Sequence, residues 1–135
     1  MDVVRRLDEL LLPVFRDVAA QITAELPKVK AGVYSCPVGS ATQSPSHHWA
    51  IDCNVPQSNP ELPDNVGLVV SVLSLVNAPT IDGDVSWGDP VGVIEAEIQA
   101  VPLSEESIGT LLASLPPLYE ALKIALRRGT PPLKL

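Results

Sequence analysis

The clearest structural signal in the chain is residues 48–55, His-Trp-Ala-Ile-Asp-Cys-Asn-Val. Apolar and more polar residues alternate along this segment, with Trp49, Ile51, Cys53 and Val55 on one side and His48, Ala50, Asp52 and Asn54 on the other. Successive side chains of a β-strand point to opposite faces of its sheet, so the alternation indicates a strand with one buried and one wetter face. Such strands are typical of antiparallel sheets.

Further strands are expected on either side of this segment, at residues 29–36, 66–76, 85–87 and 91–100. Residues 66–76 are apolar at both parities, which indicates a central strand or one whose second face is also covered. Asp82-Gly83-Asp84 is interpreted as an acidic turn together with Asp89, because Asp and Gly accept the backbone angles of tight turns. In the last strand the pattern directs Ile94, Ala96, Ile98 and Ala100 inward, and Glu95, Glu97 and Gln99 outward.

Helices are expected at both ends of the chain, over residues 2–26 and from Ser104 to about Arg128, because apolar residues recur there at three- and four-residue spacing. Asp2 and Ser104 suit the N-caps, and Gly129 suits the C-cap. Proline lacks the N–H that a helix interior needs, so a kink or break is expected near Pro13, and a bent or split helix at Pro116-Pro117.

These elements predict an α+β fold: an antiparallel meander sheet of four to five strands, with the N- and C-terminal helices packed on one face. Residues 1–129 are expected to form one domain, and residues 130–135 a flexible tail. The chain of 135 residues is 46% hydrophobic and only 4% aromatic, so the core must be aliphatic. A core of this size needs no metal or disulfide to fold.

The formal net charge of −7 argues against nucleic acids and anionic membranes as partners. The N-terminal segment is amphipathic and charged where a secretory signal would be continuously apolar, and the longest apolar stretch is too short to span a bilayer. A cytoplasmic location is therefore expected.

Two cysteines and two histidines first suggest a metal site. If residues 29–36 and 48–55 form a hairpin, however, Cys36 lies opposite His48 or Trp49, and Cys53 lies opposite Ala31 or Gly32. About five residues then separate the two sulfurs by roughly 17 Å, too far for a disulfide or a shared metal. Reduced, unlinked cysteines and no cofactor or metal are expected. His47 and His48 are interpreted as solvated side chains, and no residue is assigned a catalytic role.

Two groups of residues remain as candidates for binding. Glu95 and Glu97 project from one predicted sheet face, together with Asp52 and His48, where paired carboxylates could do acid–base work or keep the face in water. Val69, Leu73 and Leu75 would form an apolar row on the same face. Soluble monomers usually avoid such patches, so a homodimer is predicted.

Residues 92–108, Gly-Val-Ile-Glu-Ala-Glu-Ile-Gln-Ala-Val-Pro-Leu-Ser-Glu-Glu-Ser-Ile, run on through Leu115-Pro-Pro-Leu-Tyr-Glu-Ala-Leu122 to Arg128-Gly129. This part of the chain resembles the C-terminal half of the bacterial YbjN-like family, whose fold is that of class I type III secretion chaperones. In that family a last strand leads through a proline–leucine–serine cap into a long closing helix with a central tyrosine. Members usually place a helix between the third and fourth strands, for which residues 77–84 are too few.

The resemblance implies a dimeric, non-catalytic protein-binding module of chaperone or regulator type. The residues themselves favour the same function, because they offer amphipathic helices and an acidic surface without a nucleophile motif such as G-x-S-x-G. Two alternatives remain. One is a small-ligand binder or enzyme that uses Asp52, Glu95 and Glu97. The other is an immunity- or antitoxin-type inhibitor whose acidity mimics a substrate.

Overall fold

The computed structural model describes residues 2–39, 45–88 and 92–132. It contains two helices and five strands: α1 (Val3–Glu25), β1 (Lys30–Val38), β2 (Ser46–Asn54), β3 (Asn65–Leu73), β4 (Thr80–Trp87), β5 (Ile94–Pro102) and α2 (Glu105–Arg128). Asp89, placed above in the acidic turn, and the end of the expected tail lie outside the described residues.

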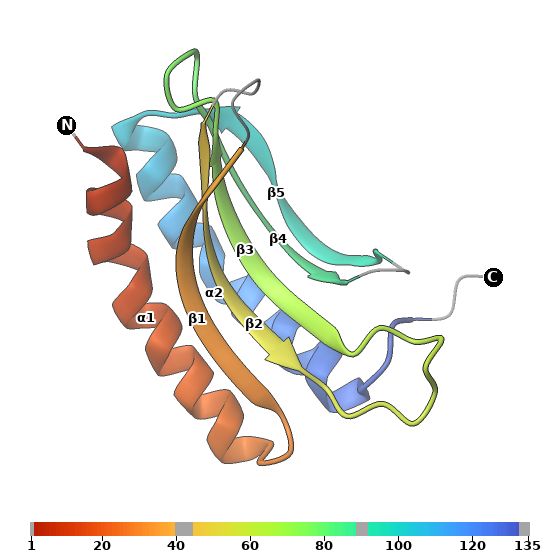
Figure 1. Cartoon of the computed structure of the whole chain (residues 1–135). Helices are drawn as coiled ribbons and strands as arrows, with labels where there is room; N and C mark the ends of the chain where they lie inside the picture. Colours follow the sequence, from red (N-terminus) through yellow and green to blue (C-terminus); the bar gives the residue numbers. More distant parts are fainter. Residues whose placement is uncertain (1, 40–44, 89–91, 133–135) are drawn as a thin grey trace.

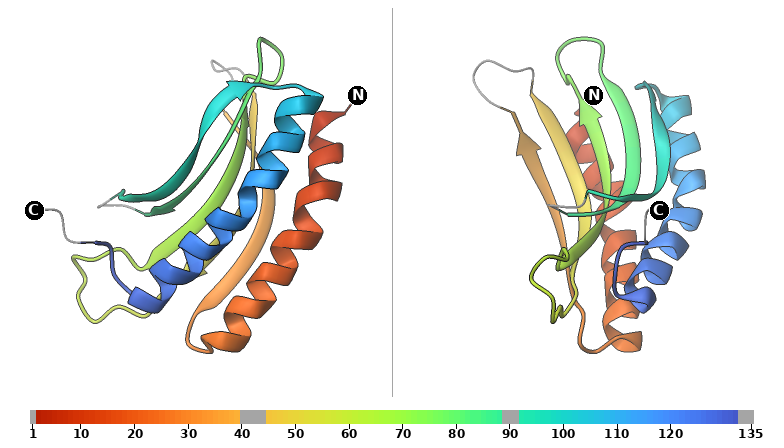
Figure 2. Two further views of the ribbon diagram at one scale, coloured as in Figure 1. Left: turned by 180° about the vertical axis from the view of Figure 1, so that it is seen from behind. Right: turned by 90° about the vertical axis from the view of Figure 1, so that its right-hand side faces the viewer.

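The strands form one antiparallel sheet in the order β1-β2-β3-β4-β5, so each strand pairs with the next in the chain. Both helices lie on the same face of this sheet (Figures 1 and 2). α1 packs over β1 and β2, and α2 over β3, β4 and β5. The predicted α+β meander with terminal helices on one face is therefore confirmed.

The register of the first hairpin is one of the two that the sequence allows. Cys36 pairs with His48, and Cys53 pairs with Ala31 near the other end of the ladder. Both cysteines are free. Cys53 faces the core, and burial raises the pKa of its thiol to about 12. A thiol that titrates so high is almost entirely protonated at neutral pH and is a poor nucleophile.

The two helices run parallel, side by side, and are joined along their length (Figure 2). Near their starts Arg6 pairs with Glu105, and near their ends Arg127 pairs with Glu25 at 3.2 Å. Between these ion pairs the rings of Phe15 and Tyr119 meet edge to face, with their centroids 6.3 Å apart. The helix layer is thus held by contacts at both ends and in the middle.

Of the kink or break predicted at Pro13 and the bend or split predicted at Pro116-Pro117, the break and the split do not occur. α1 continues through Pro13, and α2 is one helix through Pro116 and Pro117. Leu115 and Leu118, which flank the proline pair, are both buried against the sheet. Tertiary packing of these leucines therefore outweighs the hydrogen bonds that the prolines cannot donate. The predicted caps are confirmed: Asp2 and Ser104 accept backbone N–H groups, and Gly129 takes the left-handed conformation with φ 78°.

Asp82-Gly83-Asp84 does not form a turn but lies inside β4. The turn before β4 is built instead around Ser74 and Ala78, both of which have positive φ angles. β3 ends at Leu73, three residues earlier than the apolar pattern suggests. The consequence for the surface is large, because two carboxylates move from an end loop onto the face of the sheet.

The pairing of β4 with β5 contains two register shifts, between Ile81 and Gly83 and between Val85 and Ser86. Ile94 pairs with Ser86 and is exposed, against the expectation that it faces the core. Glu95 is turned toward the helix side, where it accepts a hydrogen bond of 2.8 Å from Trp87 Nε1 and pairs with Arg128. A bulge adds one residue to one strand and so reverses the alternation beyond it.

Candidate functional site

The face of the sheet that points away from the helices is called here the open face, because no described segment covers it. Its members include Lys30, Tyr34, Cys36 and Val38 of β1; His48, Ala50 and Asp52 of β2; Gly67, Val69, Ser71 and Leu73 of β3; Thr80, Asp82, Asp84 and Ser86 of β4; and Ile94, Glu97 and Gln99 of β5. The strands bow toward the helices, so this face is concave (Figure 1), and the right-hand view of Figure 2 looks onto it.

The strand registers order these side chains into rows across the sheet. One row runs through Tyr34, Ala50, Val69, Asp84 and Glu97, from β1 to β5. Apolar side chains occupy the β1–β3 part of the row and carboxylates the β4–β5 part. Ala50 is almost fully buried although no described element lies over it. The β1–β3 part of the open face is called the apolar half and the β4–β5 part the acidic half, after this row; Asp52 is the carboxylate of the former, and Ile94 is an exposed apolar residue of the latter.

A neighbouring row consists of Cys36, His48, Ser71 and Asp82 on four successive strands. These residue types suggest nucleophilic catalysis at first sight. His48 and Asp82 stand on strands separated by β3, however, so roughly 10 Å divides their backbones. A base and the carboxylate that orients it need direct hydrogen-bond contact, which this spacing does not provide for ordinary side-chain directions.

The acidic half contains a hollow of about 280 Å³, lined by Asp82, Asp84, Glu97 and Gln99 among others. Asp84 accepts a hydrogen bond of 3.0 Å from Ser86 Oγ. Burial, and secondarily the charge of Asp84, raise the pKa of the Asp82 carboxyl, while His48 acts in the opposite direction. The ionised form of Asp82 is thus less favourable in the folded chain than in water.

We expect Asp82→Asn to stabilise the chain at pH 7 but not at pH 3. Because the folded-state pKa of Asp82 lies above the usual 3.8, stability is highest while the group is protonated and falls as pH rises through the folded-state pKa. Asparagine removes that loss. Urea denaturation of both proteins at the two pH values measures the effect, with Asp17→Asn as an exposed control. If Asp82→Asn raised the free energy of unfolding equally at both pH values, or lowered it at pH 7, this account would be contradicted.

The structure places His48, Asp52, Val69, Leu73 and Glu97 on the open face, as predicted. Two other candidates lie elsewhere. Leu75 follows the end of β3 and is half-buried against the core, and Glu95 lies by α2. The apolar row is therefore shorter than expected, and Glu95 and Glu97 do not share a face.

Sequence reasoning missed Tyr34, Asp82 and Asp84 as members of this face. Tyr34 alternates with Val33 and Ser35 and could have been assigned from the hairpin register. Asp82 and Asp84 were not assigned to a strand, because Gly83 between them is typical of a tight turn.

The prediction that His47 is solvated is wrong, because its side chain is buried. Its Nε2 lies 2.6 Å from Ser35 Oγ, and Ser35 Oγ donates to Asp8 Oδ1, also at 2.6 Å. Trp49 Nε1 donates to the same oxygen at 2.7 Å. This network joins α1 to β1 and β2 on the inner side of the sheet.

The network resembles a catalytic triad in composition but not in its hydrogen-bond order. A carboxylate only accepts hydrogen bonds, so the hydroxyl proton of Ser35 points to Asp8, and Ser35 Oγ accepts from the N–H of His47. The imidazole is then a donor and does not act as the base toward the serine. Burial lowers the pKa of His47, which favours this neutral form. The arrangement satisfies buried polar groups and leaves no activated nucleophile.

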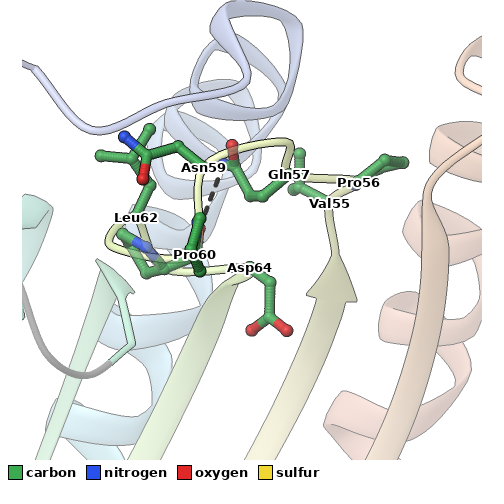
Figure 3. A pocket seen from close by; sticks show the side chains of 8 residues that line it. Val55, Pro56, Gln57, Asn59, Pro60, Leu62 and Asp64 are labelled. Carbon is green, nitrogen blue, oxygen red and sulfur yellow. Dashed lines mark hydrogen bonds between the residues drawn. The ribbon is translucent and has the colours of Figure 1, made fainter.

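A second hollow, of about 520 Å³, lies within the loop between β2 and β3 (Figure 3). Gln57 Nε2 donates to the carbonyl oxygen of Pro63 at 3.1 Å and to that of Gly129 at 2.8 Å. The amide of Gln57 is therefore used to fasten the loop to itself and to the end of α2. The carboxylate of Asp64 points away from Asn59 and Leu62 (Figure 3). The side chains thus do not converge on one point, which favours a structural role.

Among residues 2–39, 45–88 and 92–132, no three His, Cys, Asp or Glu side chains are grouped as metal ligands. Neither of the described helices combines the length and the apolar character needed to cross a membrane. No family model, curated protein or solved structure matches the chain.

Proposed function

We propose that the chain is a non-catalytic protein-binding module whose partner lies on the open face. The observation that carries this proposal is a concave sheet face that none of residues 2–39, 45–88 and 92–132 covers, on which Tyr34, Val38 and Leu73 remain 43%, 40% and 39% exposed. A five-stranded sheet with helices on one side leaves such a face to water or to a partner. Exposed apolar side chains on a concave face favour a partner.

The positions of the carboxylates favour binding over chemistry. An enzyme using Asp52, Glu95 and Glu97 would need at least two of these groups within about 10 Å of one another. Glu95 is engaged by Trp87 and Arg128 on the helix side. Asp52 and Glu97 stand on β2 and β5, three strand spacings or roughly 14 Å apart. The acid–base alternative, as predicted with Asp52, Glu95 and Glu97, therefore lacks a pair of facing groups among these three residues.

The partner is more readily a different protein than a second copy. A two-fold pairing of open faces would bring together the same carboxylates from both copies, each of which carries a net charge of −7. Leu75, one of the three residues on which the homodimer was predicted, is also not available on this face. The resemblance to secretion chaperones implies a protein partner as well. The homodimer stays a prediction that light scattering can test.

A pull-down from the native host with two matched variants tests the proposal. Leu73→Glu places a charge in the apolar half of the open face. Val14→Glu places the same charge on the outer side of α1, at a residue that is 43% exposed where Leu73 is 39% exposed. Wild type and Val14→Glu should retain the same proteins by mass spectrometry, and Leu73→Glu should lose them. Identical protein sets for all three baits would show that the open face is not the binding site.

A further inference from the structure

We infer that the partner segment is cationic and amphipathic: a stretch of polypeptide whose lysines or arginines lie over β4 and β5 and whose apolar side chains lie over β1 to β3. This inference rests on the function proposed above and specifies the chemistry of the partner.

The first step concerns where the chain uses its charges. Its described ion pairs lie on or against the helices: Arg5–Glu9, Arg6–Glu105, Lys123–Glu120, Arg127–Glu25 and Arg128–Glu95. The four carboxylates of the open face, Asp52, Asp82, Asp84 and Glu97, take part in none of these pairs. Five basic residues thus pair with acids on the helix side, whereas Lys30, at the start of β1, is the one basic residue among the described strand positions of the open face. The four carboxylates outnumber it, so the open face keeps a net negative charge.

The second step concerns the cost of that arrangement. Asp82 and Asp84 project from the same side of one strand, and Glu97 pairs directly with Asp84 on the next. Like charges opposite one another in a sheet are destabilising, and here they also border a hollow where hydration is reduced. A cation that enters the hollow would relieve this repulsion, whereas an anion or a second acidic surface would increase it.

The third step concerns the size and character of the occupant. The carboxylates of Asp84 and Glu97 lie in the same row as Tyr34 and Val69, and the whole row spans roughly 19 Å, or four strand spacings. A metal ion or a polyamine would meet the acidic half but leave the apolar half in water. A segment of polypeptide with basic and apolar side chains can cover both halves at once, as interfaces with an apolar centre and a polar rim do.

A direct binding measurement with a defined probe tests the inference. The probe is a fluorescein-labelled peptide built from repeated Lys-Leu-Lys-Ser units, and its binding to the full chain is followed by fluorescence anisotropy at about 0.15 M salt. The variant Asp82→Asn/Asp84→Asn/Glu97→Gln removes three charges from the open face. The matched control, Asp17→Asn/Asp64→Asn/Glu120→Gln, also removes three negative charges, but from exposed positions outside the open face.

We expect the open-face triple variant to bind the peptide at least ~10-fold more weakly than wild type, and the control triple variant to lose no more than ~3-fold. Circular dichroism of both variants should match wild type. Equal losses in the two variants would show that only net charge attracts the peptide and would overturn the inference. Equally tight binding of a Glu-Leu-Glu-Ser peptide would overturn it as well, and so would full displacement of the peptide by spermine or Ca²⁺ at the concentration of the probe.

The outcomes separate this inference from the proposed function. If the peptide does not bind but Leu73→Glu still loses the proteins captured by wild type, the open face binds a partner of other chemistry and only the cationic inference fails. If the peptide does not bind and the three baits of the pull-down also capture identical proteins, both the cationic inference and the proposed function are overturned.

Discussion

Replacing Asp8 with alanine should lower the free energy of unfolding by about 3 kcal/mol, because two donors lose a charged acceptor and one of them is fully buried. Asp8 Oδ1 accepts from Ser35 Oγ and from Trp49 Nε1, and Trp49 has no exposed surface. Alanine would leave the indole N–H without a partner and cut the polar link between α1 and the sheet. Urea denaturation followed by tryptophan fluorescence measures the loss.

Glu9→Ala is the matched control for this substitution. Glu9 is the next residue of α1, and its side chain is 69% exposed in an ion pair with Arg5. Surface pairs of this kind contribute about 0.5 kcal/mol or less, so the control should unfold close to wild type. If Asp8→Ala were as stable as Glu9→Ala, the network around Ser35 and His47 would not hold the helix to the sheet.

Leu122→Ala should lower the free energy of unfolding by about 3 kcal/mol, as much as Asp8→Ala. Ile124→Ala, two residues later, should change it by less than about 0.5 kcal/mol. Leu122 is fully buried under the sheet, and Ile124 is 54% exposed. Truncating a buried leucine removes its transfer free energy and leaves a cavity. The same denaturation experiment, performed on both variants, measures the contrast.

This pair of variants also tests the continuity of α2. Leu122 and Ile124 lie beyond Pro116 and Pro117, and their burial follows the helical phase set by Ile108 and Leu111 before the prolines. A break at the prolines would allow the second half of the helix to rotate and expose Leu122. Similar losses for the two variants would contradict the unbroken helix.

Local patterns were enough to predict most of the fold. Alternation over residues 48–55 placed Trp49 and Ile51 in the core, and the hairpin that it implied put Cys36 opposite His48 or Trp49, of which His48 is the observed partner. Alternation works here because each of these strands has one covered and one open face, so that burial and sequence have the same period of two residues.

Features that depend on contacts between distant segments were not predictable in this way. The bulge that turns Glu95 to the helix side arises from the pairing of β4 with β5, and leaves no mark on the alternation of β5 itself. The prolines of α2 are tolerated because of leucines packed on the sheet. Asp8 belongs to an amphipathic helix and looks like any solvent-facing acid until Ser35 and Trp49 are placed beside it.

The candidate site was predictable in part for the same reasons. His48, Asp52 and Val69 were assigned to the open face from parity alone. Asp82 and Asp84 were not, because tight turns and strand segments that contain glycine share the same residues. Of the four carboxylates on the open face, Asp52 and Glu97 were therefore predictable, whereas Asp82 and Asp84 required the bounds and register of β4.

Site-specific photo-crosslinking in the native host tests the central claim, that a partner protein lies on the open face. A photoreactive phenylalanine analogue replaces Tyr34 on the open face in one strain and Val14 on the outer side of α1 in another, two positions that are both 43% exposed. Illumination should join the chain to another protein from position 34 and not from position 14. Adducts that form equally from both positions, or only from position 14, would contradict the account.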